Sequence, residues 1–363
     1  MQSILLGTVL ALIVGLTLTP WVIDVFRARG IGKVIREDGP ATHFVKHGTP
    51  TMGGLVLMAA ATLGYAGAHL RWSGGSLRFQ QFSRAGIVIF GTAWALGVLG
   101  AIDDLLGIRP TKSVGMNERA KTAGQIVVAL GLALATLRWV GLEAKITWAG
   151  APIEWIPALP QLLFALYVFV IIFGTANGTN FADGADGLLS GSAAMNFFVF
   201  TIVAFWEFRN SDFYPQLAHG GASGLLDVAV ASAALLGACI GFLWWNAAPA
   251  RIFMGDAGSM AIGGAIASLA LFTRTQLLLP IIGGLFVLEM LSVIIQRGVF
   301  KLSRTITGTG RRVFAMAPFH HHFELRGWAE FTVIVRFWLI AALAAGLGLA
   351  LFYMDFLSHG GAG

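Results

Sequence analysis

Hydrophobic positions in this chain occur in long, nearly unbroken runs that are separated by short polar segments. A helix needs roughly 20 apolar residues to cross the hydrocarbon core of a bilayer. The pattern therefore predicts ten transmembrane helices, near residues 3–26, 52–70, 85–102, 122–140, 159–176, 188–206, 226–245, 257–272, 277–299 and 331–354. We expect an all-α polytopic integral membrane protein.

The run at 277–299 differs from the others because it carries a charged residue, Glu289, and begins near the pair Gly283 and Gly284. Glycine pairs are common places for kinks, and a membrane helix can open where neighbouring groups satisfy its backbone. We expect a bent or locally opened helix here.

Basic residues orient the bundle, because Lys and Arg near span ends are retained in the cytoplasm. With the N-terminus outside, sixteen of them fall in inner loops and seven in outer loops. No Lys or Arg precedes the first run, which favours a retained helix over a cleavable signal. The predicted inner loops, expected to build a site at the cytoplasmic face, are 27–51, 103–121, 177–187, 246–259 and 300–329.

Composition agrees with a membrane setting. Hydrophobic residues make up 56% of the chain and charged residues 12%, against roughly 25% charged residues in soluble domains. The net charge of +6 comes from dispersed basic residues, which argues against a nucleic-acid partner. The single cysteine, Cys239, excludes a disulfide within one chain. Without visible repeats, one polytopic domain over residues 1–363 is the simplest description.

Five aspartates at the ends of the apolar runs are the first candidates for function: Asp103, Asp104, Asp183, Asp186 and Asp256. All fall on the predicted cytoplasmic side, and a carboxylate beside hydrocarbon is unfavourable unless it has a role. Adjacent carboxylates can share a metal or divide into a base and an electrostatic partner. A solvated helix end is the alternative, although the helix dipole disfavours two aspartates at a C-terminus.

The surrounding inner loops leave similar alternatives open. The segment 177–187, NGTNFADGADG, offers oxygen ligands that suit Mg²⁺, or it forms an ordinary Asn/Asp/Gly turn. Asp256 precedes a helix and could be its N-cap, while Phe253 could stack on a base or be an interfacial aromatic. Lys46 could meet a phosphate or anchor the interface.

Three consecutive histidines, His320, His321 and His322, lie in the last inner loop. Histidines can donate to phosphate or take a proton near neutral pH. Three successive side chains do not converge readily on one tetrahedral zinc ion.

The motifs GTPTMGG, DD, NFADGADGL, NAAPARIFMGDAGS and MAPFHHHFELRGW span nearly the whole chain. In order and spacing they resemble the polyprenyl-phosphate N-acetylhexosamine-1-phosphate transferases, and the histidine run resembles the muramoyl-pentapeptide branch. The resemblance implies transfer of phospho-MurNAc-pentapeptide from UDP-MurNAc-pentapeptide to undecaprenyl phosphate, giving lipid I and UMP, with Mg²⁺ as cofactor. It also implies ten spans, a homodimer and the bacterial inner membrane.

The resemblance further assigns residues. Asp103 is implied as the base toward the lipid phosphate, Asp104 as a support of the polar centre, Asp256 as the Mg²⁺ ligand and His320 as a nearby catalytic group. The substrate-binding residues that it implies are Lys46, Thr51, Lys121, Asn177, Asn180, Asp183, Gly184, Asp186, Phe253, Gly255, Ser259, Glu289, Gln296, His321 and His322.

The chain departs from the family at Ala182 and Ala185, where Thr and Leu are usual, and Arg251 replaces a common Lys. Two other functions stay open: a sister transferase that moves GlcNAc-1-phosphate, and an ion-coupled transporter with broken helices and intramembrane carboxylates. The carboxylates cluster at one face without inverted repeats, which disfavours the transporter. The sequence does not separate direct attack by the lipid phosphate from a covalent aspartyl intermediate.

Overall fold

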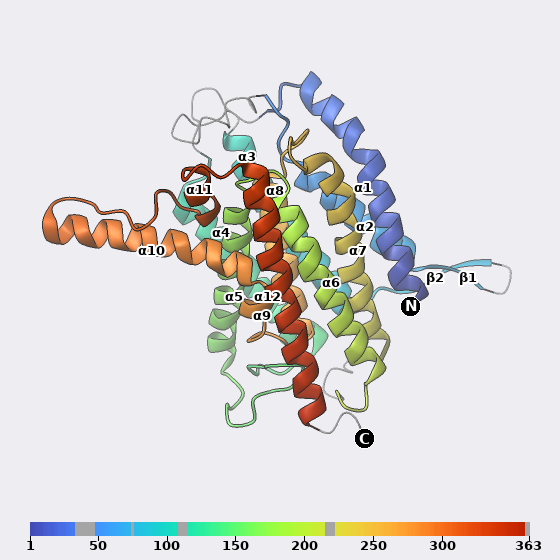
Figure 1. Cartoon of the computed structure of the whole chain (residues 1–363). Helices are drawn as coiled ribbons and strands as arrows, with labels where there is room; N and C mark the ends of the chain where they lie inside the picture. The colour runs from blue at the N-terminus through green and yellow to red at the C-terminus, as the bar shows by residue number, and fades with distance from the viewer. Residues whose placement is uncertain (33–47, 74–75, 108–114, 215–221, 360–363) are drawn as a thin grey trace.

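A computed structural model describes residues 1–32, 48–73, 76–107, 115–214 and 222–359 (Figure 1). Its helices are α1 (Gln2–Ala28), α2 (Gly54–Ala68), α3 (Arg84–Gly107), α4 (Glu118–Leu134), α5 (Gln161–Ala182), α6 (Leu188–Arg209), α7 (Ala222–Asn246), α8 (Gly255–Phe272), α9 (Leu279–Ile282), α10 (Gly284–Thr307), α11 (Phe319–Glu324) and α12 (Glu330–Ser358). A π-helical turn, η2 (Ala135–Val140), continues α4 and ends at Gly141 with a left-handed φ of 86°.

Every predicted hydrophobic run contains a helix. Within the described ranges, eight helices are long and apolar enough to cross a membrane. The run at 52–70 forms α2, whose 15 residues are shorter than a full span. The run at 277–299 breaks at Gly283 into α9 and α10, as its sequence indicates. The multi-pass helical architecture is confirmed, whereas the count of ten spans and the orientation remain predictions.

The core centres on α8, which packs against α3, α5, α2 and α6. Every residue of α8 except Asp256 is buried. Small residues make this possible, because they let helix backbones approach closely in a membrane. A Cβ added at Gly263 would lie 2.5 Å from Ala176 Cα and 2.7 Å from Ala176 N of α5. The central helix therefore has no face open to lipid.

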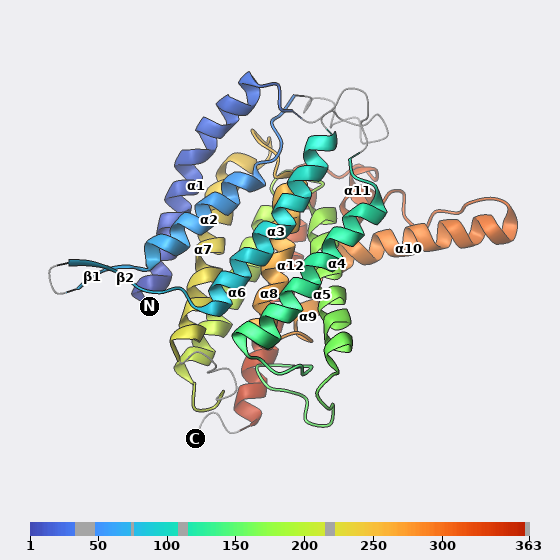
Figure 2. The same cartoon turned by 180° about the vertical axis from the view of Figure 1, so that it is seen from behind.

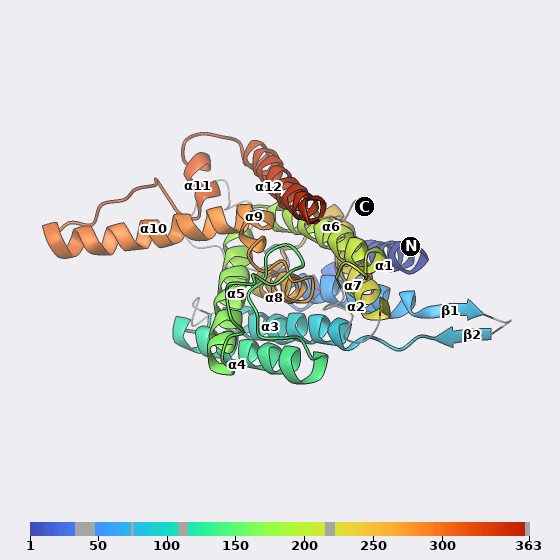
Figure 3. The same cartoon turned by 90° about the horizontal axis from the view of Figure 1, so that it is seen from below.

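Two elements project from opposite sides of the bundle (Figures 2 and 3). One is an antiparallel hairpin of β1 (Leu70–Ser73) and β2 (Ser76–Phe79), which lies between the predicted hydrophobic runs 52–70 and 85–102. The other is the distal part of α10, which extends sideways away from α5 and α12 (Figure 1). The fold is thus helical apart from one short hairpin in the described residues.

We expect Gly263→Ala to destabilise the protein by about 1–3 kcal/mol, because the added methyl group meets the backbone of α5. Gly91→Ala is the matched control, since a Cβ there meets nothing within 4 Å. Thermal unfolding of both variants in detergent measures the difference. Equal midpoints for the two variants would contradict the close α5–α8 packing.

Candidate active site

The centre of the site is one ammonium group held between two carboxylates. Lys121 Nζ, in the first turn of α4, lies 3.1 Å from Asp103 Oδ2 of α3 and 2.5 Å from Asp256 Oδ2 of α8. The three side chains are 18%, 15% and 26% exposed, respectively, so a ligand can still reach them. Two carboxylates around one cation leave net negative charge for a further cation.

Local structure brings Asp103 and Lys121 together. Asp103 lies near the end of α3, and its Oδ1 accepts a short hydrogen bond from the Met116 backbone N–H, where the chain returns toward α4. The Asn117 side chain caps α4 by accepting from Ala120 N at 2.7 Å. Lys121 follows on the next residue and points back toward the end of α3. The N-terminus of α4 therefore fixes the position of the lysine.

Asp104 makes different contacts from Asp103. Its Oδ1 and Oδ2 accept from the backbone N–H groups of Asp256 and Ala257, at 3.1 and 3.0 Å. These are N–H groups of the first turn of α8, which otherwise lacks a side-chain cap. The N-cap role that the sequence left open for Asp256 thus belongs to Asp104, and the Asp256 carboxylate is free to bind Lys121 and Asn180.

Gly255 allows this close approach. Its φ of 72° is left-handed, and a Cβ there would lie 2.5 Å from Asp104 Oδ2 and 3.0 Å from Thr51 Oγ1. Thr51 is buried at 3% exposure beside this turn. A side chain at position 255 would be strained and would also displace the carboxylate that caps α8.

The end of α5 contributes an amide network. Asn180 Nδ2 donates to Asp256 Oδ1 at 2.8 Å and to Ser259 Oγ at 2.9 Å, so Asn180 contacts the central carboxylate directly and Ser259 is joined to it through the same amide. Asn177 instead donates to Gln125 Oε1 of α4 and to the Phe173 carbonyl. Asn177 therefore contacts α4 in this structure, not Asp256.

Asp186 and Phe253 tie the inner loops together. Asp186 is 5% exposed, and its Oδ2 accepts from Ala250 N at 2.9 Å. Its own N–H donates to Glu330 Oε1 of α12 at 3.2 Å. Phe253 N donates to the Pro50 carbonyl at 2.8 Å, which joins the first and fourth inner loops. Lys46 lies outside the described residues.

His320 is fully buried next to Gly184 in the loop 177–187. Its Nδ1 lies 3.1 Å from Glu289 Oε1, and because a carboxylate only accepts, Nδ1 carries the proton. Its Nε2 is buried and has no hydrogen-bond partner among the described residues, and a Cβ at Gly184 would overlap it. A buried polar atom of this kind is available to a ligand. The glycine at position 184 leaves room for the ring, because any side chain there would collide with it.

Glu289 and Gln296 hold the histidine segment onto α10. Glu289 Oε2 accepts from Phe319 N at 2.7 Å. Gln296 Oε1 accepts from Val313 N and Phe314 N, and its Nε2 donates to the Phe314 carbonyl at 2.9 Å. The sequence analysis grouped both residues with the substrate contacts. Their contacts in the structure are with the protein, which supports a positioning role.

The other two histidines are also oriented by protein groups. His321 Nδ1 lies 2.6 Å from Glu324 Oε2. His322 Nδ1 accepts from Ala315 N at 3.0 Å, which leaves its proton on Nε2. The run of three histidines therefore presents three differently held rings and not one metal cage.

The donor set fits a loosely held divalent ion. Across the described ranges, no group of three or more acidic, histidine or cysteine side chains is arranged to hold a metal. Mg²⁺ does not require one, because it keeps several waters and binds through one or two carboxylates plus substrate phosphate. The Asp103 and Asp256 carboxylates, which converge on the same ammonium, meet that requirement.

Sequence reasoning missed Glu330, which binds the Asp186 loop, and Gln125, which binds Asn177. Glu330 stands in the first turn of α12, directly before the last apolar run. The criterion that selected the five aspartates, a carboxylate at the end of a span, would have found it. Gln125 carries no such signal in the sequence.

We expect Asp104→Ala to lower the free energy of unfolding by about 1–2 kcal/mol, because the first turn of α8 loses its cap. Asp103→Ala removes one of two like charges around Lys121 and should destabilise less. Thermal unfolding in detergent compares the two variants. A larger loss for Asp103→Ala would contradict the capping role of Asp104.

Comparison with known proteins agrees with this geometry. Residues 86–274 match the model of glycosyl transferase family 4. A phospho-N-acetylmuramoyl-pentapeptide-transferase of Frankia casuarinae is 46% identical over 99% of this chain and 100% of its own length. The enzyme of that name from Mycobacterium leprae is 45% identical over the full length of both chains. The one from Saccharopolyspora erythraea is 44% identical over 99% of this chain and 98% of its own.

These relatives confirm the resemblance that the motifs indicated, across the whole chain and not only at the site. The chain belongs to the phospho-N-acetylmuramoyl-pentapeptide-transferases within glycosyl transferase family 4.

Proposed function

We propose that this protein transfers phospho-MurNAc-pentapeptide from UDP-MurNAc-pentapeptide to undecaprenyl phosphate, giving lipid I and UMP in peptidoglycan synthesis. The observation that carries the proposal is the Asp103–Lys121–Asp256 centre at one end of a helical membrane bundle. The full-length relatives with the corresponding name support the substrate assignment. We assign the protein to the bacterial inner membrane, with this centre at the cytoplasmic face.

Both substrates are anions, so charge compensation is the first task of the site. A phosphate oxygen of the lipid attacks the sugar-linked phosphorus of the nucleotide, a new P–O–P bond forms, and the bond to the α-phosphate breaks to release UMP. Lys121 provides a positive charge at a partly exposed position beside two carboxylates. Positioning and charge stabilisation of this kind supply most of the rate acceleration in phosphoryl transfer.

Asp103 is the group that we assign as base toward the lipid phosphate. Its carboxylate is 15% exposed and is oriented by Met116 N and Lys121 Nζ, so it can take a proton without moving. Asp104 is less suited to that task because both its oxygens cap the first turn of α8, whereas Asp103 Oδ2 accepts from the Lys121 ammonium, which can transfer to a substrate phosphate. With Asp103 as the base, we propose direct attack by the lipid phosphate and not a covalent aspartyl intermediate.

We propose Mg²⁺ as the cofactor, held by Asp256. The ion would neutralise charge on the diphosphate and on the departing UMP. Asn180 donates to Asp256 Oδ1 and so orients that carboxylate for contact with Lys121 or with the ion. His320, whose Nε2 is free beside Gly184, is assigned to the phosphate or sugar of the donor substrate. The assignments of Lys46, Asp183 and Phe253 to substrate binding, and the homodimer, stay predictions.

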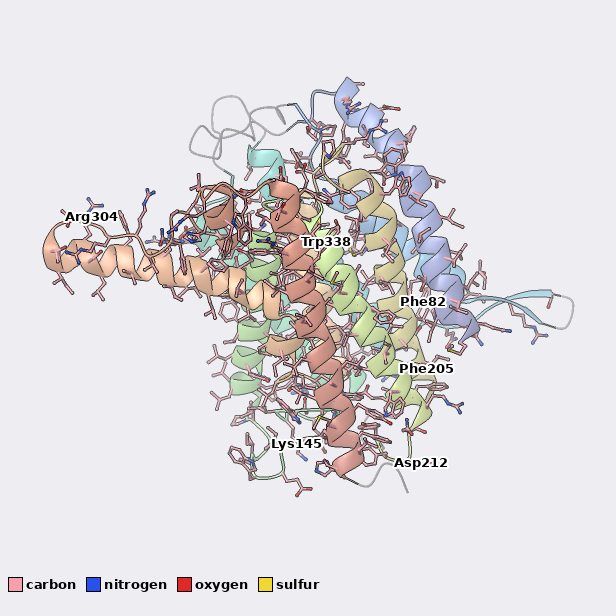
Figure 4. All side chains as sticks on the ribbon, viewed as in Figure 1. Phe82, Lys145, Phe205, Asp212, Arg304 and Trp338 are labelled. Carbon is pink, nitrogen blue, oxygen red and sulfur yellow. The ribbon has the colours of Figure 1, made fainter. Side chains whose placement is uncertain are left out.

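We expect Asp103→Asn and Asp256→Asn each to slow UMP release by roughly 100- to 1,000-fold, because each removes a charged group at the reacting centre. Asp212→Asn is the matched control, since this exposed aspartate lies at the opposite end of the bundle (Figure 4). UMP release by purified protein in detergent measures all three. Near-wild-type rates in either site variant, with unchanged thermal unfolding, would overturn the assignment of that residue.

We expect UMP to appear only when UDP-MurNAc-pentapeptide, undecaprenyl phosphate and Mg²⁺ are all present, and to stop when the metal is chelated. Replacing the donor with UDP-GlcNAc is the specificity control. Release with UDP-GlcNAc but not with the muramoyl donor would assign the chain to the sister branch. No release with either donor from folded protein would contradict transferase activity.

A further inference from the structure

Helix α10 leaves the helical bundle after its first third. Its buried residues are Leu285, Phe286, Glu289 and Ser292, and no residue from 293 to 307 is buried. The distal part extends sideways from the bundle at the end that carries α11 (Figures 1 and 3). We call residues 291–312, the distal helix with its following turn, the α10 arm.

One face of the arm is apolar and uncovered. Leu291, Ile295, Val299, Leu302 and Ile306 recur at intervals of three or four residues, which places them on one stripe of the helix. Their exposed fractions run from 37% at Val299 to 71% at Ile306. An exposed stripe of five apolar residues on a projecting helix of a membrane protein is suited to the acyl region of a bilayer.

A second face of the arm is basic. Arg297, Lys301 and Arg304 also recur at intervals of four and three residues, and all are exposed. Figure 4 shows Arg304 near the tip of the arm. Residues 290–323 contain these three, Arg311 and Arg312, and no acidic residue.

The turn that carries Arg311 and Arg312 is joined to the helix by a backbone contact, because Arg311 N donates to Ser303 Oγ at 2.8 Å. Arg297 also meets Glu118 at 3.1 Å, but both side chains are mostly exposed, so this pair compensates little of the charge. The arm therefore combines five positive charges with an apolar stripe.

We propose that the α10 arm is a binding surface for anionic phospholipid headgroups of the leaflet at the active-site end. The apolar stripe enters the acyl boundary, and Lys301, Arg304 and the turn arginines meet the headgroup phosphates. Basic amphipathic helices bind membrane surfaces by this combination of burial and charge. A second copy of the chain is a poorer occupant, because two-fold packing of this face would oppose like charges.

The test measures which lipid surrounds the arm. In a Cys239→Ala background, a fluorescent probe is attached at Leu302→Cys on the apolar stripe, and a second protein carries it at Leu343→Cys, a 74% exposed position of α12. Both are placed in nanodiscs with equal parts of phosphatidylglycerol and phosphatidylcholine. Quenching is compared when either the anionic or the zwitterionic lipid is brominated.

We expect the anionic lipid to quench the probe at 302 several-fold more than the zwitterionic lipid does, and the two lipids to quench equally at 343. Lys301→Gln with Arg304→Gln should reduce the preference, by up to about fivefold for each charge removed. Arg138→Gln with Arg209→Gln is the matched control, since it removes two exposed charges near the other end of the bundle.

Equal quenching by both lipids at 302, or loss of the preference in both double variants, would overturn the proposal. Rising salt should also reduce the preference in the unaltered protein, because headgroup contacts are screened. A preference at 302 that is insensitive to salt would contradict a charge-based surface even if the arm variant failed to fold.

Discussion

The sharing of one ammonium by two carboxylates is the constraint on which the site depends. Lys121, Asp103 and Asp256 come from three helices, and none of these charges is favourable alone at the end of an apolar bundle. Their mutual contact requires the ends of α3, α4 and α8 to meet. Two helix caps hold these ends in place. Asn117 caps α4, and Asp104 caps α8.

Much of the architecture was predictable because hydrophobic run length is a direct physical signal. The break near Gly283 was also readable, since Glu289 and two glycines mark it. The projection of α10 and the hairpin at 70–79 were not, because run length says nothing about the direction in which a helix leaves the bundle. Direction depends on which side chains find partners, and those are distant in sequence.

The site was predictable at the level of residue types and less so at the level of contacts. Asp103 and Asp104 are identical neighbours in sequence, yet one meets Lys121 and the other caps α8, because successive residues of a helix point in different directions. Glu289 and Gln296 were found as polar positions in an apolar run. Only the structure shows that they bind the backbone of Val313, Phe314 and Phe319.

The complete burial of α8 has a consequence for how this protein can change over generations. Every other residue of that helix is buried against a neighbour, so a larger or smaller side chain there would disturb the packing. Variation is instead permitted on the lipid-facing sides of α1, α4, α5 and α12, where exposed apolar residues are numerous. Substitutions on those sides can therefore change the surface that meets the bilayer without moving the carboxylate at the start of α8.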